Sequence, residues 1–495
     1  MSAAEKSDLQ ICRILLSSGG GAPYAENTAG DVLATFNAAV LGQLTVTDES
    51  FDLRPGLLES FQFDFEKLEY QLRLRSDLVF HNGRPVRAQD LEYSLLRGFF
   101  SPNRSFYNIY LNTIDGIDSI QPGDSFRSGA VSGVRLVDDF TLAVTLKQAN
   151  PSFLHSLSQP FFSLVPMEEM KSDYMSWKGV PIGAGPYRVA SPFADGRLRL
   201  QLVDVRLKTQ GAVRDIEIFT RPDEANPNYD VVVNYPSGMD MTSYQQHITK
   251  MPASVRTIFF SNANVLGQNP HFREAVQKAI YRADIVGNIA DLDVTNEILP
   301  RHFWGRAIRP DPYSLDAAKK AMAEVPKKLL EKTWRIPVFA KTQLSERQSY
   351  FAEKIKAQLA KIGLKVEFYP NDEKFISAKT AKESPFRLSG RVTDYVDPLI
   401  MFASFQSDSP YEYDQPRGES KKEFEKLYKV AASASSLESR YQSVRDLSEF
   451  IVKNSLAVAI AEEKVIYYYN PTRVESLGSQ PMPLILLIQN IRTKK

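Results

Sequence analysis

The sequence predicts an α/β protein, and one stretch carries most of this prediction. Residues 336–340 and 364–368 have the apolar, partly alternating pattern of β-strands. Between them, Ser345 and Gln348 match the capping box that begins a helix, and apolar residues then recur at three- and four-residue spacing. Gly363 follows at the position where a helix end favours a positive φ. A strand, a helix and a second strand in this order are typical of a mostly parallel α/β sheet.

The stretch 72–97 contains the clearest local pattern nearer the N-terminus. Strict alternation over residues 70–75 is typical of a half-buried strand, and a second short strand is expected at 78–80. Asn82-Gly83 supplies the positive φ angles of a tight turn. The helical spacing of apolar residues then predicts an amphipathic helix from about Ala88.

Other elements can be predicted from their end signals. Asn269 and Pro270 provide an N-cap and a proline at the first helical position, so a helix is expected to begin there. A further helix is expected from near Ser435 to about Asn454. Strands are expected at 457–460 and 465–469.

Composition limits the classes of function. A length of 495 residues suggests roughly three domains. With 43% apolar and 24% charged residues, the chain has the profile of a soluble globular protein. A net charge of +1 gives no support for binding to nucleic acid or to an anionic membrane. The single cysteine, Cys12, excludes an internal disulfide and a cysteine-based metal site.

No pattern in the sequence indicates an enzyme, a metal site or a cofactor. None of the five histidines pairs with another at metal-ligand spacing. A phosphate-binding loop, a nucleophile elbow and a zinc-protease motif are absent from the sequence. Carboxylates are abundant, but their spacing nominates no catalytic pair. Catalysis is therefore the least favoured class, and neither a metal nor a cofactor is expected.

The turn and helix within 72–97 also carry a resemblance to a known family. The peptide/nickel class of bacterial ABC-transporter solute-binding proteins has a typical block, Phe-His-(Asp/Asn)-Gly-x-Pro-(Phe/Val)-x-Ala-x-Asp-(Val/Leu)-x-(Phe/Tyr)-Ser. This block resembles the residues Phe80, His81, Asn82, Gly83, Pro85, Val86, Ala88, Asp90, Leu91, Tyr93 and Ser94. Further blocks resemble the family in the same order, at 55–60, 133–142, 183–187, 272–282 and 360–366. Each block is weak alone, but six in the correct order identify the fold.

The resemblance implies a periplasmic-binding-protein-like fold. Two α/β lobes with an inserted third domain are expected, with the ligand cleft between the lobes. The expected first lobe comprises 1–57, 180–259 and 462–495, the inserted domain 58–179, and the second lobe 260–461. A chain that crosses twice between lobes is consistent with hinge closure.

The segment 391–398, Arg-Val-Thr-Asp-Tyr-Val-Asp-Pro, resembles the family pattern Trp-x-x-Asp-(Tyr/Asn)-x-(Asp/Glu)-Pro. In peptide-binding members the first acid, here Asp394, pairs with the α-ammonium group of the ligand, because an enclosed charge needs a partner. The alternative is that Asp394 is only a turn residue. Tyr395 is a second expected ligand contact. Asp397 is explained structurally, as an N-cap before Pro398.

Three further residues are candidates for ligand contact. Arg391 stands where the family commonly has Trp, and it brings a charge and five donors. Arg391 and the nearby Arg387 either meet a ligand carboxylate or form structural salt bridges. Trp304 either borders the cleft, as this region does in the family, or packs in the core.

The implied function is that of the solute-binding component of an ABC importer. Such a protein captures short peptides and delivers them to a membrane permease. It is expected to be a monomer, peripheral to the membrane through the permease or a lipid anchor. The alternatives are another solute (a nickel chelate, an opine-like compound or an oligosaccharide) and a cytoplasmic ligand-sensing domain.

The location of the protein is a separate question. Residues 1–18 carry acids and have no apolar core, so they are not a signal peptide as written. Either an export signal has been removed or the protein stays in the cytoplasm. The resemblance favours the first explanation, and therefore a periplasmic or other extracytoplasmic location.

Overall fold

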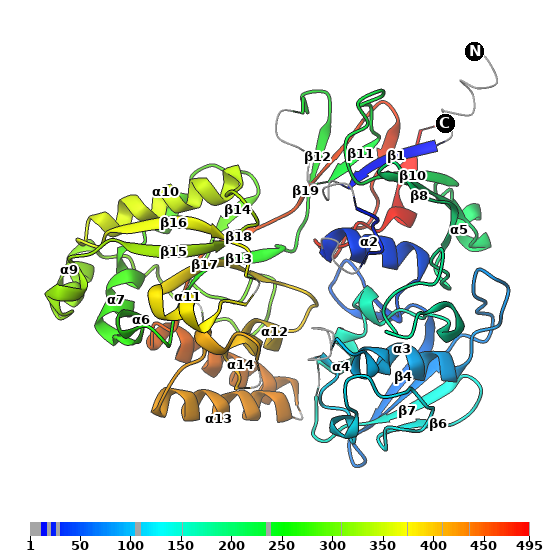
Figure 1. Cartoon of the computed structure of the whole chain (residues 1–495), viewed down its shortest axis with the longest axis horizontal. Helices are drawn as coiled ribbons and strands as arrows, with labels where there is room; N and C mark the ends of the chain where they lie inside the picture. Colours follow the sequence, from blue (N-terminus) through cyan, green and yellow to red (C-terminus); the bar gives the residue numbers. More distant parts are fainter. Residues whose placement is uncertain are drawn as a thin grey trace. The chain divides into compact units, whose positions relative to one another are not determined.

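The structure is a computed structural model, and it describes residues 11–16, 21–25, 30–103, 110–150, 152–233, 239–307, 309–373, 375–407, 409–434 and 436–494. The chain divides into two compact units, with 1–250 and 465–495 in unit 1 and 251–464 in unit 2. The chain therefore passes from one unit to the other twice (Figure 1). Each unit has its own central sheet.

The central sheet of unit 1 has seven strands in the order β12-β19-β11-β1-β10-β9-β8. Their bounds are β1 (Ile11–Leu16), β8 (Tyr187–Ala194), β9 (Arg197–Leu202), β10 (Asp215–Phe219), β11 (Val231–Val233), β12 (Gln245–Ile248) and β19 (Ile466–Tyr469). β1 runs parallel to both of its neighbours, and the other pairs are antiparallel. The smaller elements of this unit are α2 (Gly30–Val40), β2 (Thr45–Thr47), β3 (Leu53–Pro55), α5 (Val205–Thr209), β20 (Val474–Ser476) and β21 (Arg492–Thr493).

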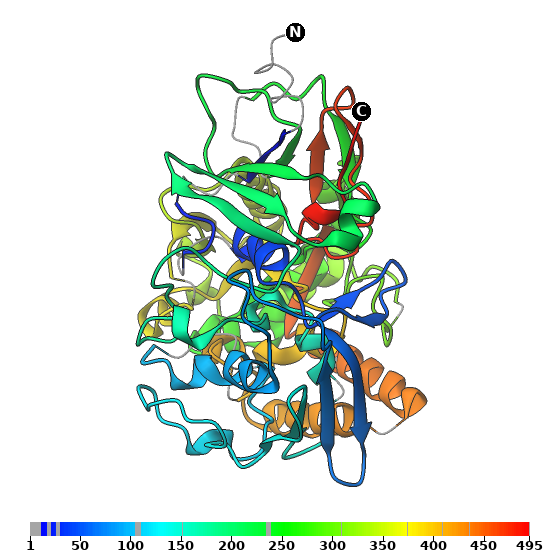
Figure 2. The same ribbon diagram turned by 90° about the vertical axis from the view of Figure 1, so that its right-hand side faces the viewer.

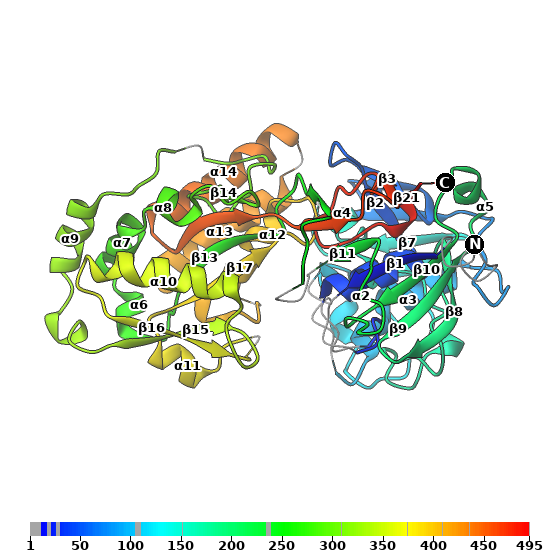
Figure 3. The same cartoon turned by 90° about the horizontal axis from the view of Figure 1, so that it is seen from above.

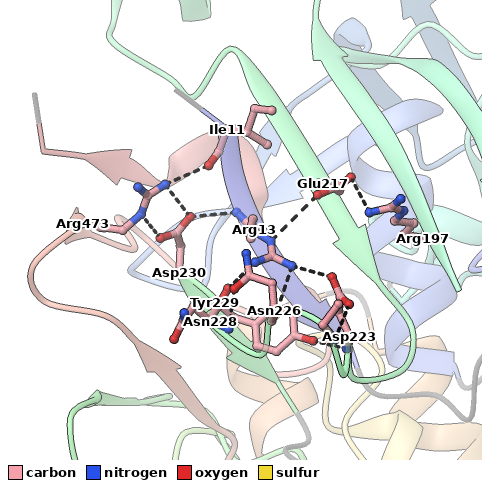
Figure 4. Close-up of polar contacts among 11 residues, drawn as sticks. Ile11, Arg13, Arg197, Glu217, Asp223, Asn226, Asn228, Tyr229, Asp230 and Arg473 are labelled. Carbon is pink, nitrogen blue, oxygen red and sulfur yellow. Dashed lines mark hydrogen bonds and ion pairs between the residues drawn. The ribbon is translucent and has the colours of Figure 1, made fainter. Parts of the chain in front are cut away.

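A polar network fixes the centre of this sheet (Figure 4). The backbone N–H of Arg13, on β1, donates to Asp230 (2.8 Å), and its guanidinium donates to Asp223 (3.0 Å). Arg473, which follows β19, forms an ion pair with the same Asp230 and donates to the carbonyl of Ile11 (3.0 Å). These contacts join three segments that are far apart in the sequence. The donors named here bind acceptors of the protein itself, so the network has a structural role.

Residues 58–179 form a second sheet within unit 1. Its strands follow the order β4-β5-β7-β6, all antiparallel, with bounds β4 (Leu58–Asp64), β5 (Glu69–Leu74), β6 (Val134–Leu136) and β7 (Thr141–Thr145). Figure 2 shows β4 and β5 as a hairpin. The α-helices α3 (Ala88–Phe100) and α4 (Phe153–Ser156) accompany the sheet in the described part of this range. The status of this region as a separate third domain stays a prediction.

The predicted pattern around the turn is mostly confirmed. Tyr70, Leu72 and Leu74 of β5 are buried, as the alternation predicts, and α3 begins at Ala88. The strand expected at 78–80 is wrong, because only one isolated bridge forms there, between Val79 and Pro85. Pro85 has no N–H to donate to a ladder, and the partner segment enters α3 at Ala88, so pairing does not extend further.

His81 connects this turn to the glycine-rich segment 183–187. Its Nε2 lies 2.9 Å from the carbonyl oxygen of Gly185, and the N–H of Gly183 donates to its Nδ1 (3.4 Å). A Cβ on Gly183 would lie 2.2 Å from the carbonyl oxygen of Val40. These glycines therefore allow two backbone segments to approach closely.

The sheet of unit 2 has six strands in the order β14-β18-β13-β17-β15-β16. Their bounds are β13 (Ser254–Phe260), β14 (Leu292–Val294), β15 (Trp334–Phe339), β16 (Val366–Asn371), β17 (Phe386–Val392) and β18 (Ala457–Glu463). The helices are α6 (Val265–Gln268), α7 (Pro270–Ala279), α8 (Arg282–Val286), α9 (Leu315–Ala323), α10 (Glu346–Ala360), α11 (Ala378–Glu383), α12 (Leu399–Phe402), α13 (Glu419–Ser433) and α14 (Leu437–Lys453). Figures 1 and 3 show α10 along one face of the sheet, and Figure 1 shows α13 and α14 on the side away from α10.

The predicted strand–helix–strand stretch of unit 2 is confirmed as β15, α10 and β16, and the two strands are parallel. Ser345 and Gln348 form the expected capping box, and Gly363 has a φ of +78°. α7 begins after its Asn269 cap, as predicted. α14 has Ser436 as its N-cap, and the expected start at Ser435 lies outside the described residues.

The division between units differs from the expected lobe boundaries at 259/260 and 461/462. The structure divides the chain at 250/251 and 464/465. The physical reason is the pairing of β13, which bonds to β17 on one side and to β18 on the other. β13 and β18, which the expected boundaries would cut, therefore belong to the unit 2 sheet over their whole length.

Candidate functional site

The five residues predicted to contact a ligand all lie in unit 2. Arg387 and Arg391 are on β17, and Asp394 and Tyr395 are in the loop that follows it. On β17, Phe386 and Leu388 face the hydrophobic core. Side chains alternate along a strand, so the two arginines project from the opposite face. That face packs against two single-turn helices, Ala403–Phe405 and Glu412–Asp414.

Arg387 forms a nearly buried ion pair with Asp414. Its Nε donates to Oδ1 of Asp414 (3.0 Å), a second nitrogen contacts Oδ2, and the two side chains are 11% and 2% exposed. The guanidinium also lies 4.7 Å from the ring centre of Phe259. Burial lowers the pKa of Arg387, but the charge and hydrogen bonding of Asp414, together with the nearby Tyr411, outweigh burial, and the net pKa is raised. Arg387 therefore has the structural salt bridge that was one of its two expected roles.

Arg391 has a different environment on the same strand face. Its Nη2 donates to the carbonyl oxygen of Ile400 (2.6 Å), and its guanidinium lies 5.6 Å from the ring centre of Tyr411. Its Nε is buried and has no hydrogen-bond partner within the described part of the chain. A buried donor without a partner costs about 1–3 kcal/mol. An anionic oxygen of a ligand would remove this cost.

The loop after β17 is anchored at its first residue. Thr393 donates through its N–H to the carbonyl of Ala253 (3.0 Å) and through its hydroxyl to that of Pro252 (2.6 Å). Asp394 is half-buried. Tyr395 is 6% exposed, and its pKa is raised well above the usual value, first by burial and then by the charge of Asp397. The phenol of Tyr395 thus stays neutral, and contact of either side chain with a ligand stays a prediction.

Asp397 and Trp304 are connected through one arginine of α14. One oxygen of Asp397 accepts the N–H of Leu399 (2.9 Å), and the other pairs with Arg440. The side chains of Asp397 and Arg440 are 0% and 9% exposed. The Arg440 guanidinium in turn lies 5.1 Å from the ring centre of the half-buried Trp304. Asp397 therefore supports the start of α12, one residue before the N-cap position that Pro398 occupies.

Among the described residues, the three arginines of this region differ in their charge partners. Arg387 is neutralised by Asp414, and Arg440 by Asp397. Arg391 makes no ion pair with any residue that the structure describes. It lies only three positions before Asp394 in the sequence. Unit 2 thus presents a cation and an acid close together along the chain, which suits a ligand that carries both charges.

The sequence did not reveal the residues that give Arg387, Arg391 and Asp397 their different partners. Tyr411, Asp414 and Arg440 carry no sequence signal for a site, because Tyr411 and Asp414 lie in an irregular segment and Arg440 lies in an ordinary amphipathic helix. The signal that could have found them is three-dimensional: two arginines of one strand face share Tyr411, and one of them has Asp414 beside it.

The described residues also bear on metal binding and on membrane insertion. Over the described ranges, no three His, Cys, Asp or Glu side chains gather in a way that could hold a metal ion. Among the same residues, no helix has both the length and the hydropathy needed to cross a membrane.

Comparison with known proteins gives a consistent result. The family "Bacterial extracellular solute-binding proteins, family 5 Middle" matches residues 52–413. The chain is 24% identical to a probable ABC transporter periplasmic-binding protein, SapA, of Escherichia coli, over 76% of this chain and 72% of the relative. It is also 24% identical to the dipeptide-binding protein of Escherichia coli, over 87% and 84% of the two chains.

Solved structures share the fold. The OppA protein of Haemophilus influenzae, in complex with the peptide RPPGFSPFR, superimposes with a TM-score of 0.74 at 17% identity, over 98% of this chain and 99% of the other. NikZ of Campylobacter jejuni, in complex with Ni(L-His), gives a TM-score of 0.73 at 17% identity and the same coverage. The expected α/β fold of the periplasmic-binding-protein type is thereby confirmed.

Proposed function

Because the chain belongs to family 5 of the bacterial extracellular solute-binding proteins, we propose that it captures short peptides for an ABC importer. In this proposal the protein works outside the cytoplasm and delivers its ligand to a membrane permease. Relatives named for dipeptide binding and for peptide transport support the ligand class.

The observation that carries the proposal is the environment of Arg391. A short peptide at neutral pH has an ammonium group at one end and a carboxylate at the other. We assign the ammonium to Asp394 and the carboxylate to Arg391, whose buried Nε–H lacks a partner among the described residues. Charge-assisted hydrogen bonds at both ends would fix the direction of the peptide and limit its length. Main-chain hydrogen bonds between them would leave side-chain identity free.

The role of Asp394 can be tested by calorimetric titration with trialanine and N-acetyl-trialanine. Asp394→Asn should weaken trialanine binding by about 30-fold or more, because truncating one member of a buried charge pair costs roughly 2–5 kcal/mol. The acetylated peptide should bind weakly to both proteins. Asp372→Asn, an exposed acid of the same unit, is the matched control and should bind like the wild type. Equal affinity of Asp394→Asn and wild type for trialanine would refute the role.

The role of Arg391 can be tested by blocking the other end of the peptide, its terminal carboxylate. Trialanine amide, which lacks the terminal carboxylate, should bind the wild type less tightly than trialanine does. Arg391→Gln should lose this preference and bind both peptides alike. Arg417→Gln, at an exposed position of unit 2, should keep the wild-type preference. A full preference for the free carboxylate in Arg391→Gln would show that another group recognises it.

A second ligand class is favoured by one specific observation. Arg391 replaces the tryptophan of the family pattern, and a cation there also suits an organic acid such as a metal-chelating amino acid or an opine-like compound. Solved relatives are in complex with Ni(L-His) and with agropinic acid. Native mass spectrometry of the purified protein distinguishes the classes: a mixture of short peptides supports the proposal, and a single organic acid or chelate contradicts it.

A further inference from the structure

A pocket of about 730 Å³ lies beside α3 in unit 1. Its volume falls within the roughly 300–1,000 Å³ typical of small-molecule sites. The walls come from α3, from the segment 167–178, and from Arg84 and Phe126. All of these residues belong to unit 1, whereas Arg391 and Asp394 belong to unit 2. The pocket and the site proposed for peptides therefore share no residue.

The most informative wall residue is Tyr93, which is 1% exposed. Its ring packs edge-on against Phe126 (5.0 Å) and against Tyr174 (6.3 Å). Its hydroxyl has no hydrogen-bond partner among the residues described by the structure. Burial raises the pKa of Tyr93 to about 12, so the hydroxyl keeps its proton and remains a donor.

Other tyrosines with the same burial do not share this feature. The hydroxyl of Tyr187 donates to the carbonyl of Val213 (2.8 Å), and that of Tyr467 donates to the carbonyl of Pro483 (2.7 Å). A buried hydroxyl without a partner is unfavourable, and native proteins avoid it with few exceptions. Because Tyr93 lines a pocket, a ligand atom can supply what the fold does not.

The charges around the pocket define the rest of the ligand. Arg84 pairs with two carboxylates, Asp90 (2.7 Å) and Glu168 (2.6 Å), so this cluster carries a net negative charge and the positive charge of the lining comes from its two lysines. Lys178 donates to the backbone carbonyl of Glu168 (2.8 Å). Lys171 is exposed and makes no ion pair with a described residue, so it leaves a positive charge at the rim.

Apart from Gln89 and Ser172, the remaining wall is apolar and adaptable. Phe126 and Tyr174 offer ring surfaces, and Met167 and Met170 complete the lining, with Met167 43% exposed. Methionine side chains fit irregular shapes and make favourable contacts with aromatic rings. The lining therefore suits a flat apolar body.

We propose that this pocket binds a small organic anion with a flat aromatic body. The body lies against Phe126 and the two methionines, a hydrogen-bond acceptor at its inner end receives the Tyr93 hydroxyl, and the anionic group at its outer end faces Lys171. This is a second ligand site, additional to the proposed capture of peptides and independent of it.

Two matched probes test the proposal by calorimetric titration. 6-Hydroxy-2-naphthoate has an acceptor at one end and a carboxylate at the other, and 2-naphthoate has only the carboxylate. The wild type should bind the hydroxylated probe about tenfold more tightly, as one recovered hydrogen bond allows. Tyr93→Phe keeps the ring and removes the hydroxyl, so the preference should disappear and the hydroxylated probe should bind no more tightly than 2-naphthoate.

Charge and site controls complete the experiment. Lys171→Glu should weaken both probes severalfold, whereas Lys319→Glu, at an exposed position of unit 2, should not change either affinity. Asp394→Asn should also leave the probes unaffected, and Tyr93→Phe should leave trialanine binding unaffected, so the two proposals fail separately. Tyr93→Phe should melt at the wild-type temperature or higher, because it loses a hydroxyl that the fold does not satisfy. Absence of saturable binding by both probes, or a tenfold preference that survives in Tyr93→Phe, would overturn the proposal.

Discussion

Replacement of Asp397 by alanine should destabilise unit 2 by about 3–5 kcal/mol. The carboxylate is fully buried and has two partners, the amide of Leu399 and the guanidinium of Arg440. Its removal leaves the buried Arg440 without its counter-charge, and breaking a buried ion pair in this way costs about 3–5 kcal/mol. Loss of the bond to Leu399 contributes about 1 kcal/mol of that total, as loss of a helix cap does.

The assay should report on unit 2 alone. The chain has three tryptophans, of which Trp304 and Trp334 lie in unit 2 and Trp177 in unit 1. In a Trp177→Phe background, urea unfolding followed by tryptophan fluorescence therefore measures unit 2. Asp397→Ala should lower the midpoint with little change in slope, because the surface exposed on unfolding stays similar.

A control and a second variant make this prediction refutable. Glu419 pairs with Lys422, but these side chains are 88% and 74% exposed, so Glu419→Ala should cost less than about 0.5 kcal/mol. Adding Arg440→Met to Asp397→Ala should recover part of the loss, because no unpaired charge then remains buried. A cost below about 1 kcal/mol for Asp397→Ala, or no recovery in the double variant, would show that the pair does not hold the loop after β17.

Two further predictions concern the turn of unit 1. Burial lowers the pKa of His81, so the unfolded chain takes up a proton on this side chain at a higher pH than the folded chain does. The free energy of unfolding should therefore fall as the pH drops below about 6.5. His81→Gln should flatten this fall in urea titrations between pH 8 and pH 5, and an unchanged pH profile would contradict the assignment. Gly183→Ala should destabilise unit 1 by about 1–3 kcal/mol or more, because the new Cβ would lie 2.2 Å from the carbonyl oxygen of Val40, whereas Gly179→Ala has open space and should be neutral in thermal melts.

Much of the fold could be predicted because its signals are local. The capping box, the apolar periodicity and the glycine that follows predict α10, and all three signals lie within a short stretch of sequence. The boundary between the units could not be predicted in this way. It depends on β13 pairing with β18, whose residues are about two hundred positions away in the sequence. Nothing within 254–260 specifies that partner.

The candidate site shows the same limit at the scale of one strand. Arg387 and Arg391 are the same residue type, four positions apart, on one face of β17, and sequence reasoning gave them the same two alternatives. The structure separates them, because Asp414, 27 positions after Arg387, lies beside that arginine. Arg387 is thereby held in a structural ion pair. The Nε–H of Arg391 has no hydrogen-bond partner among the described residues. Recognition of a ligand's carboxylate should therefore fail in Arg391→Gln, whereas the main effect of Arg387→Gln should be lower stability, since it leaves Asp414 buried and unpaired.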